Sequence, residues 1–192
     1  YGKLRIIEEK QVGKSRADIV MVLPGLLTGI EIKSDADSYV RLSRQVKDYD
    51  RFFDRNMVVA GSSHAAHVRE HVPGWWGIIT VEQNDREIDF YVLRQPQENP
   101  MMNWKRKLSL LWRPELAHIQ ELTAMPRYKE KSKAFVIEKI LAKVPGEQLS
   151  VLVSEELFER DYTRIEEVIR AYKIQNRPEL KGRTGKRKRR RP

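Results

Sequence analysis

Three residues near the N-terminus, Asp18, Glu31 and Lys33, have the types and spacing that could bind a divalent cation beside a phosphate. Glu31 and Lys33 are two residues apart in an alternating run, so on a strand both project from the same face. Mg²⁺ takes oxygen ligands and is commonly held by one or two carboxylates plus a phosphate, and lysine adds a compact positive charge. The sequence therefore predicts metal-dependent phosphodiester hydrolysis, with Mg²⁺ or Mn²⁺ bound by Asp18, Glu31 and the Ile32 carbonyl.

Two strands and a helix must position these residues. A short apolar run, Ile19 to Leu23, and the alternating run Gly29 to Lys33 flank Pro24-Gly25, a dipeptide that favours a turn. We expect the two runs to pair as a hairpin that brings Asp18 toward Glu31. A helix should follow, because apolar residues recur at steps of three and four. This stripe consists of Tyr39, Leu42, Val46, Tyr49 and Phe53.

Asp18, twelve further residues and then Glu31-Ile32-Lys33 resemble the motif of the PD-(D/E)xK nuclease superfamily. Gln45 and Tyr49 resemble the Q-x-x-x-Y pair of its RecB-like branch, and the E-I-K-S-D and W-W-G-I runs resemble small bacterial and phage stand-alone nuclease-like proteins. The residue before Asp18 is alanine, where proline is usual. The resemblance implies a restriction-endonuclease-like α/β core and a Mg²⁺-dependent deoxyribonuclease. Its implied catalytic residues are Asp18, Glu31, Lys33, Gln45 and Tyr49.

A second interpretation stays open beside the enzyme. A charged pair on a strand is usually a solvated face, and Asp…Glu-x-Lys patterns arise by chance in a chain with 33% charged residues. The alternative is a non-catalytic nucleic-acid-binding or adaptor protein that retains the nuclease fold. The intact acidic and basic motif residues favour the nuclease.

Basic residues are concentrated at the C-terminus. The chain has 37 Lys and Arg against 27 Asp and Glu, and eight of the basic residues fall between Lys181 and Arg191, which leaves 29 against 27. Such a segment buries no apolar area, so 177–192 is predicted to be a disordered tether for phosphate. The residues expected to contact nucleic acid, with DNA favoured, are Arg16, Arg41, Arg44, Lys186, Arg187, Lys188 and Arg189.

The remaining patterns set the organisation of the chain. We expect an α/β core with a central mixed sheet flanked by helices over 1–95, a helical region over 96–176 and the tail over 177–192. Leu4 to Val12 is either a first strand or the end of a helix. The absence of cysteine and of a long apolar run favours a cytoplasmic protein without a membrane span. The helical region is a candidate surface for a protein partner or a homo-oligomer.

Overall fold

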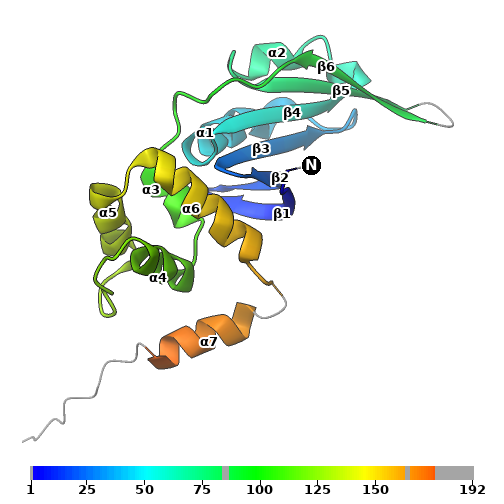
Figure 1. Cartoon of the computed structure of the whole chain (residues 1–192). Helices are drawn as coiled ribbons and strands as arrows, with labels where there is room; N and C mark the ends of the chain where they lie inside the picture. The colour runs from blue at the N-terminus through cyan, green and yellow to red at the C-terminus, as the bar shows by residue number, and fades with distance from the viewer. Residues whose placement is uncertain (1, 84–86, 163–164, 176–192) are drawn as a thin grey trace, which may run out of the picture.

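The computed structural model describes residues 2–83, 87–162 and 165–175, and its centre is a six-stranded sheet (Figure 1). The strands are β1 (Arg5–Val12), β2 (Ser15–Leu23), β3 (Leu26–Lys33), β4 (Arg55–Gly61), β5 (Gly77–Gln83) and β6 (Ile88–Arg94). They lie in the sheet in chain order. β1, β2 and β3 pair antiparallel, β3, β4 and β5 pair parallel, and β6 is antiparallel to β5. The prediction of an α/β fold with a mixed sheet flanked by helices is confirmed.

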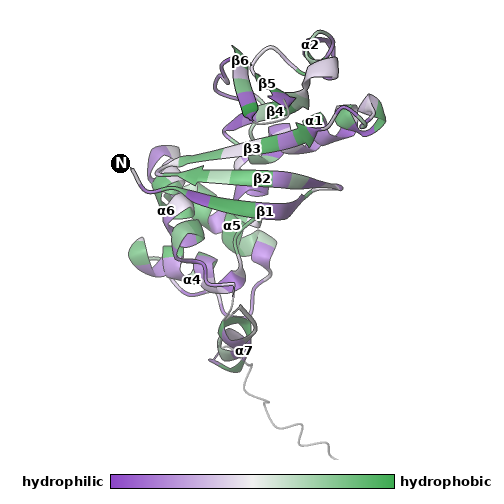
Figure 2. Ribbon diagram, turned by 90° about the vertical axis from the view of Figure 1, so that its right-hand side faces the viewer, coloured by the Kyte–Doolittle hydropathy of each residue, from purple (hydrophilic) through white to green (hydrophobic). Residues whose placement is uncertain are grey.

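Two tight turns connect the first three strands. Gly13 has φ +60° and Gly25 has φ +72°, which is backbone that glycine adopts without a Cβ penalty. The first segment, which the sequence left open between strand and helix, is a strand paired with β2 from Arg5 to Val12, with Glu9 outside the register. Figure 2 shows that β1 and β2 are hydrophilic where they approach their shared turn. Exposed residues alternate there with the buried residues Val12, Ser15 and Ala17, so one face of this end is covered and the other faces solvent.

Helix α1 (Leu42–Phe52) covers one face of the sheet, after a short 3-10 turn, η1 (Tyr39–Arg41). The helix begins three residues later than the apolar stripe predicted, but Leu42, Tyr49 and Phe53 of that stripe are fully buried. Gly29 of β3 lies directly beneath it, since a Cβ there would be 2.3 Å from a ring carbon of Phe53. This close approach brings the side chains of α1 within reach of those of β3.

In the described part of the chain, five helices follow the sheet. They are α3 (Trp104–Ser109), α4 (Arg113–Leu122), α5 (Lys133–Lys143), α6 (Gly146–Glu159) and α7 (Ile165–Gln175). Helices α3 to α6 gather at one end of the sheet, and α7 lies beyond α4 (Figure 1). Asn103 and Ser132 cap α3 and α5, because their side chains accept hydrogen bonds from the backbone N–H three residues later. None of the helices in the described ranges is long and apolar enough to cross a membrane.

A buried ion pair fastens the helices to the sheet. The Lys107 ammonium of α3 donates to both oxygens of Asp54 at 2.7 Å, and Lys107 has no exposed surface. Asp54 also accepts a hydrogen bond from the Leu27 N–H at 2.7 Å, at the start of β3. The position of α3 is thereby set relative to the strand that carries Glu31.

Candidate nucleic-acid interface

Glu31 is the centre of a closed hydrogen-bonded cluster between β3 and α1. Its side chain is 2% exposed, and one oxygen accepts from the Lys33 ammonium at 2.9 Å and from the Gln45 amide. The other oxygen accepts from the Tyr49 hydroxyl at 2.5 Å. Lys33 also donates to the Gln45 carbonyl oxygen at 3.2 Å. The four residues thus satisfy one another inside the protein.

Burial sets the protonation equilibria of this cluster. Removal from water raises the pKa of Glu31 above its usual 4.5, although hydrogen bonds from Tyr49 and Lys33 act in the opposite direction. Burial, followed by the nearby Glu31 charge, raises the pKa of Tyr49, so its hydroxyl stays a donor. Asp18 raises the pKa of Glu31 further, which indicates that the two carboxylates interact electrostatically. The cluster is a buried ion pair supported by two neutral donors.

Asp18 lies at the edge of this cluster. Its carboxylate accepts a hydrogen bond from the Ile32 N–H at 2.8 Å, and its own N–H donates to the Tyr49 oxygen at 3.2 Å. Asp18, Glu31, Ile32 and Lys33 line one cavity of about 870 Å³ between the β1–β2 hairpin, β3 and the start of α1. We call this cavity the hairpin groove. The structure therefore brings together all five residues of the predicted site.

The rim of the hairpin groove is charged. Its lining contains five acidic residues (Glu8, Glu9, Asp18, Glu31, Asp37) and five basic residues (Lys14, Arg16, Lys33, Arg41, Arg44), so the formal charges cancel. The acids are largely engaged: Glu9 pairs with Arg16 at 3.3 Å, and Asp37 accepts from the N–H and hydroxyl of Ser34 at 2.8 Å. Arg41 and Arg44 are exposed, and within the described ranges neither guanidinium has a carboxylate at ion-pair distance. These two cations remain available to an anion.

Asp48 of α1 holds the β1–β2 hairpin in place. Its carboxylate accepts from the Lys14 N–H at 3.1 Å and the Ser15 hydroxyl at 2.7 Å. A Cβ on Gly13 would be 2.5 Å from an Asp48 oxygen, so the turn and the helix are tightly fitted. Asp48 and the turn at Gly13 are far apart in the sequence, so no local pattern predicted this contact.

The paired tryptophans serve the fold. The indole N–H groups of Trp76 and Trp75 donate to Asp50 at 2.8 and 3.2 Å, and the Asn56 amide donates to the same oxygen at 2.9 Å. Burial raises the pKa of Asp50, and these three donors oppose that shift. Trp76 is completely buried, so it is not available to stack on a base.

The predicted cation would have to share the groove with the hydrogen bonds of Glu31. Within the described ranges no group of three or more His, Cys, Asp and Glu is arranged to hold a metal ion. Both oxygens of Glu31 already accept hydrogen bonds, so a cation there would have to displace Lys33, Gln45 or Tyr49. Asp18 and Ile32 line the cavity beside Glu31.

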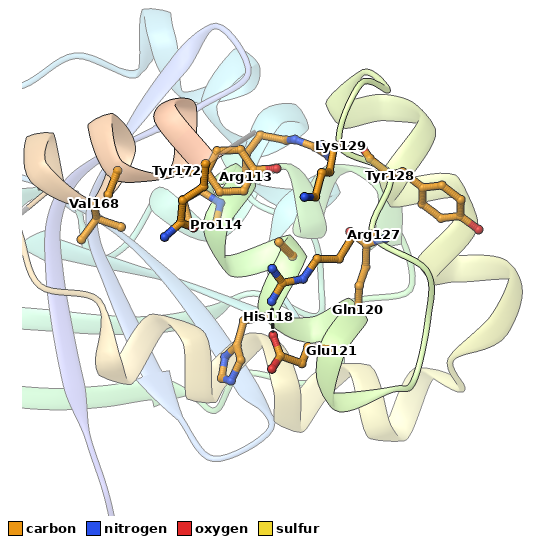
Figure 3. Close-up of a pocket in the computed structure, with 13 residues that line it drawn as sticks. Arg113, Pro114, His118, Gln120, Glu121, Arg127, Tyr128, Lys129, Val168 and Tyr172 are labelled. Carbon is orange, nitrogen blue, oxygen red and sulfur yellow. Dashed lines mark hydrogen bonds and ion pairs between the residues drawn. The ribbon is translucent and has the colours of Figure 1, made fainter. Parts of the chain in front are cut away.

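A second cavity, of about 310 Å³, lies between α4, the segment after it and α7 (Figure 3). Arg127 donates to Glu121 at 2.5 Å, and Arg113 donates through Nη2 to the Tyr128 carbonyl at 3.0 Å. Within the described ranges the buried Nη1 of Arg113 and the Lys129 ammonium have no hydrogen-bond partner. The tail residues Lys186, Arg187, Lys188 and Arg189 lie outside the described residues. The hairpin groove contains most of the predicted site residues together with Arg16, Arg41 and Arg44, so it is the candidate interface.

Comparison with known proteins relates the chain to a described family. The family described as "Bacteriophage P4 protein cII" matches residues 3–177. "Protein cII" of Enterobacteria phage P4 is 28% identical over 101 residues, which are 53% of this chain and 38% of that protein, so the chain spans well under half of this relative. A solved structure, Pyrococcus furiosus SfsA in complex with Ca²⁺, aligns with 17% identity and a TM-score of 0.31 over 49% of this chain and 55% of that one.

These comparisons overturn the enzymatic prediction. The matched family and relative are protein cII and not a PD-(D/E)xK nuclease, so the descriptions nuclease, hydrolase, endonuclease and Mg²⁺-dependent deoxyribonuclease are wrong. The physical reason for the error is visible in the cluster: Glu-x-Lys on a strand also encodes an internal ion pair, and here that pair is sealed by Gln45 and Tyr49. Because the family match extends over residues 3–177, the chain belongs to the bacteriophage P4 protein cII family.

Proposed function

We propose that this chain is a non-catalytic nucleic-acid-binding or adaptor protein with a regulatory role, and that DNA is its first partner. It would bind the phosphate backbone along the hairpin groove. The observation that carries the proposal is the pair of exposed guanidiniums, Arg41 and Arg44, beside a groove whose main carboxylates are bound internally. Arginine binds phosphate through a planar fork of donors, and each such contact releases counterions.

The arrangement of the groove supports positioning without base recognition. Arg41 precedes α1 and Arg44 lies in its first turn, one turn apart, so both side chains can reach neighbouring phosphates of one strand. The described part of the groove offers no exposed aromatic side chain for stacking. We therefore expect weak dependence on sequence and strong dependence on salt. In this proposal the sheet and α1 keep a restriction-endonuclease-like arrangement while Glu31 and Lys33 stabilise the fold.

The decisive experiment is fluorescence anisotropy of a labelled DNA duplex with the full chain and two double variants. Arg41→Ala/Arg44→Ala should weaken binding about tenfold or more and reduce the slope of log K against log salt by about 2, one unit for each lost phosphate contact. The control is Arg69→Ala/Arg127→Ala, which removes the same charge from two exposed residues outside the groove. Equal losses of affinity in both double variants would show that only net charge matters. That result would refute the proposal that DNA binds in the hairpin groove.

A divalent cation at Asp18, Glu31 and the Ile32 carbonyl stays a prediction. Isothermal titration with MnCl₂ tests it independently of DNA, using wild type and Asp18→Asn. Binding heat in wild type that disappears in Asp18→Asn would support the site. No binding heat in either protein, or equal heat in both, would exclude the predicted cation site.

A further inference from the structure

A third cavity is lined by residues of β1, the β1–β2 turn, α1 and α3. It has a volume of about 340 Å³, and we call it the α3 pocket. Two of its lining residues, Lys10 and Arg106, are basic and none is acidic. Gln11 lines both this pocket and the hairpin groove, so the two sites are neighbours. The lining residues are Lys10, Gln11, Gly13, Phe52, Arg106, Ser109, Leu110 and Trp112.

Both cations of the α3 pocket lack an acceptor. Within the described ranges no oxygen accepts a hydrogen bond from the Lys10 ammonium or the Arg106 guanidinium. Lys105, on the same helix as Arg106, differs because it pairs with Glu138 at 2.9 Å. The Ser109 hydroxyl donates to the Arg106 carbonyl at 2.6 Å. Lys10 and Arg106 are the charged residues in the lining of the pocket.

The surroundings of Lys10 contain more positive than negative charge. Arg160 and Lys133 face it from the segment after α6 and from the start of α5, and Glu115 of α4 is the acid that favours its charged form. Glu115 already holds Arg160 through two contacts of 2.6 Å. Burial, together with Arg160 and Lys133, lowers the pKa of Lys10 to about 8. A bound anion would relieve this repulsion.

We propose that the α3 pocket binds a phosphate group between the Lys10 ammonium and the Arg106 guanidinium. A phosphate oxyanion, with one negative charge in a nucleic-acid backbone and up to two in a free phosphate compound, suits two unpaired cations of which Lys10 is half-buried and Arg106 is exposed. The phosphate could belong to a nucleic-acid backbone or to a free phosphate compound. The nucleic-acid source rests on the proposed function, because a DNA strand bound in the hairpin groove would pass Gln11 and reach the α3 pocket. The free phosphate compound does not depend on that function.

The site should respond to pH through Lys10. The facing groups are Arg106, Arg160, Lys133 and Glu115, and neither arginine loses its charge in the accessible range. Burial also lowers the pKa of Lys133, whose ammonium donates to the Ser109 carbonyl at 2.7 Å. Binding should therefore be strongest below pH 8 and weaken about tenfold between pH 7 and pH 9, as the Lys10 charge is lost.

Isothermal titration of the full chain with inorganic phosphate at pH 7 tests the site directly. Lys10→Met and Arg106→Met should each weaken binding about tenfold or more. The matched control, Lys105→Met, should bind like wild type because that lysine is paired outside the α3 pocket. Equal affinities for wild type and Lys10→Met, or no binding to wild type at millimolar phosphate, would overturn the proposal.

A second arm remains decisive even if a methionine variant fails to fold. Sulfate keeps its charge between pH 7 and 9, so its affinity reports only on the protein. Lys10→Arg should bind sulfate at pH 7 and lose the decline toward pH 9, since arginine stays charged. The same decline in wild type and Lys10→Arg would show that Lys10 is not the titrating group that holds the anion.

DNA binding by the same variants identifies the source of the phosphate. If Lys10→Met and Arg106→Met weaken duplex binding as Arg41→Ala/Arg44→Ala does, the phosphate is part of the backbone. If these variants bind inorganic phosphate more weakly but bind DNA as wild type does, the pocket takes a free phosphate compound. A groove double variant that binds DNA normally would refute the proposed function while leaving the phosphate titration intact.

Discussion

The ion pair between Glu31 and Lys33 should behave as a structural element, and a double-mutant cycle can show it. The two side chains are 2% and 3% exposed and their charged atoms are 2.9 Å apart. Removing one partner of a buried pair leaves an uncompensated charge and costs about 3 to 5 kcal/mol. Lys33→Met should therefore lower the free energy of unfolding by about that amount, whereas Glu31→Gln/Lys33→Met, which leaves no buried charge, should fall within about 1 to 2 kcal/mol of wild type.

Urea unfolding followed by circular dichroism measures these differences. With a slope of about 2 to 3 kcal/mol per molar urea, a loss of about 4 kcal/mol lowers the midpoint by about 1.5 to 2 M. The coupling energy of the cycle should then exceed about 2 kcal/mol. If the single variant costs less than about 1 kcal/mol, or if the two substitutions are additive, the pair does not stabilise the fold and the structural interpretation fails.

The cycle also has a signature in pH. Because the pKa of Glu31 is raised in the folded protein, its contribution to stability is complete below its usual 4.5 and is lost as pH rises through the folded pKa. Lys33→Met removes the stabilising cation and raises that pKa further. Its cost should therefore be small near pH 4, where Glu31 is protonated in both states, and largest above neutral pH. A cost that is equal at pH 4 and pH 8 would contradict this assignment.

Three further outcomes are expected. Gly29→Ala should destabilise by about 1 to 3 kcal/mol, because its Cβ would be 2.3 Å from the Phe53 ring, while Gly74→Ala, with no atom within 4 Å, should change stability by less than about 0.5 kcal/mol in the same urea assay. Lys107→Met should cost about 3 to 5 kcal/mol because it leaves Asp54 without its cation, and adding Asp54→Asn should recover part of that loss. Deleting residues 181–192 removes eight basic residues and should flatten the salt dependence of DNA binding; an unchanged slope would exclude the tail as a tether.

Local patterns in the sequence predicted much of the fold around the groove. The alternation from Gly29 to Lys33 and the Pro24-Gly25 turn correctly indicated the β2–β3 hairpin. Gln45 and Tyr49 are four residues apart, so their position on one face of α1 followed from helix periodicity, and both reach Glu31. These features depend on steps of two to four residues, which a sequence shows directly.

The chemistry of the same residues could not be predicted in this way. A strand pattern places Glu31 beside Lys33 but does not determine whether the pair faces solvent, a ligand or a helix. That depends on how closely α1 approaches Gly29, which is a property of packing. The α3 pocket was still harder to predict from the sequence. Lys10 and Arg106 belong to separate elements and come together only when α3 docks near the hairpin. The contact between Asp54 and Lys107, which positions α3, likewise joins residues distant in the sequence.

The order of the strands has a consequence for how the molecule is made. Because β1 to β6 lie in the sheet in chain order, each strand pairs with the one synthesised just before it. No early strand has to wait for a distant partner, and no later strand has to insert between two that are already paired. The two parallel connections, from β3 to β4 through α1 and from β4 to β5, separate paired strands by the most residues. Closing these loops should therefore limit the folding rate. The sheet can thus assemble progressively as it leaves the ribosome, with β6 as the growing edge and the helices α3 to α6 joining last.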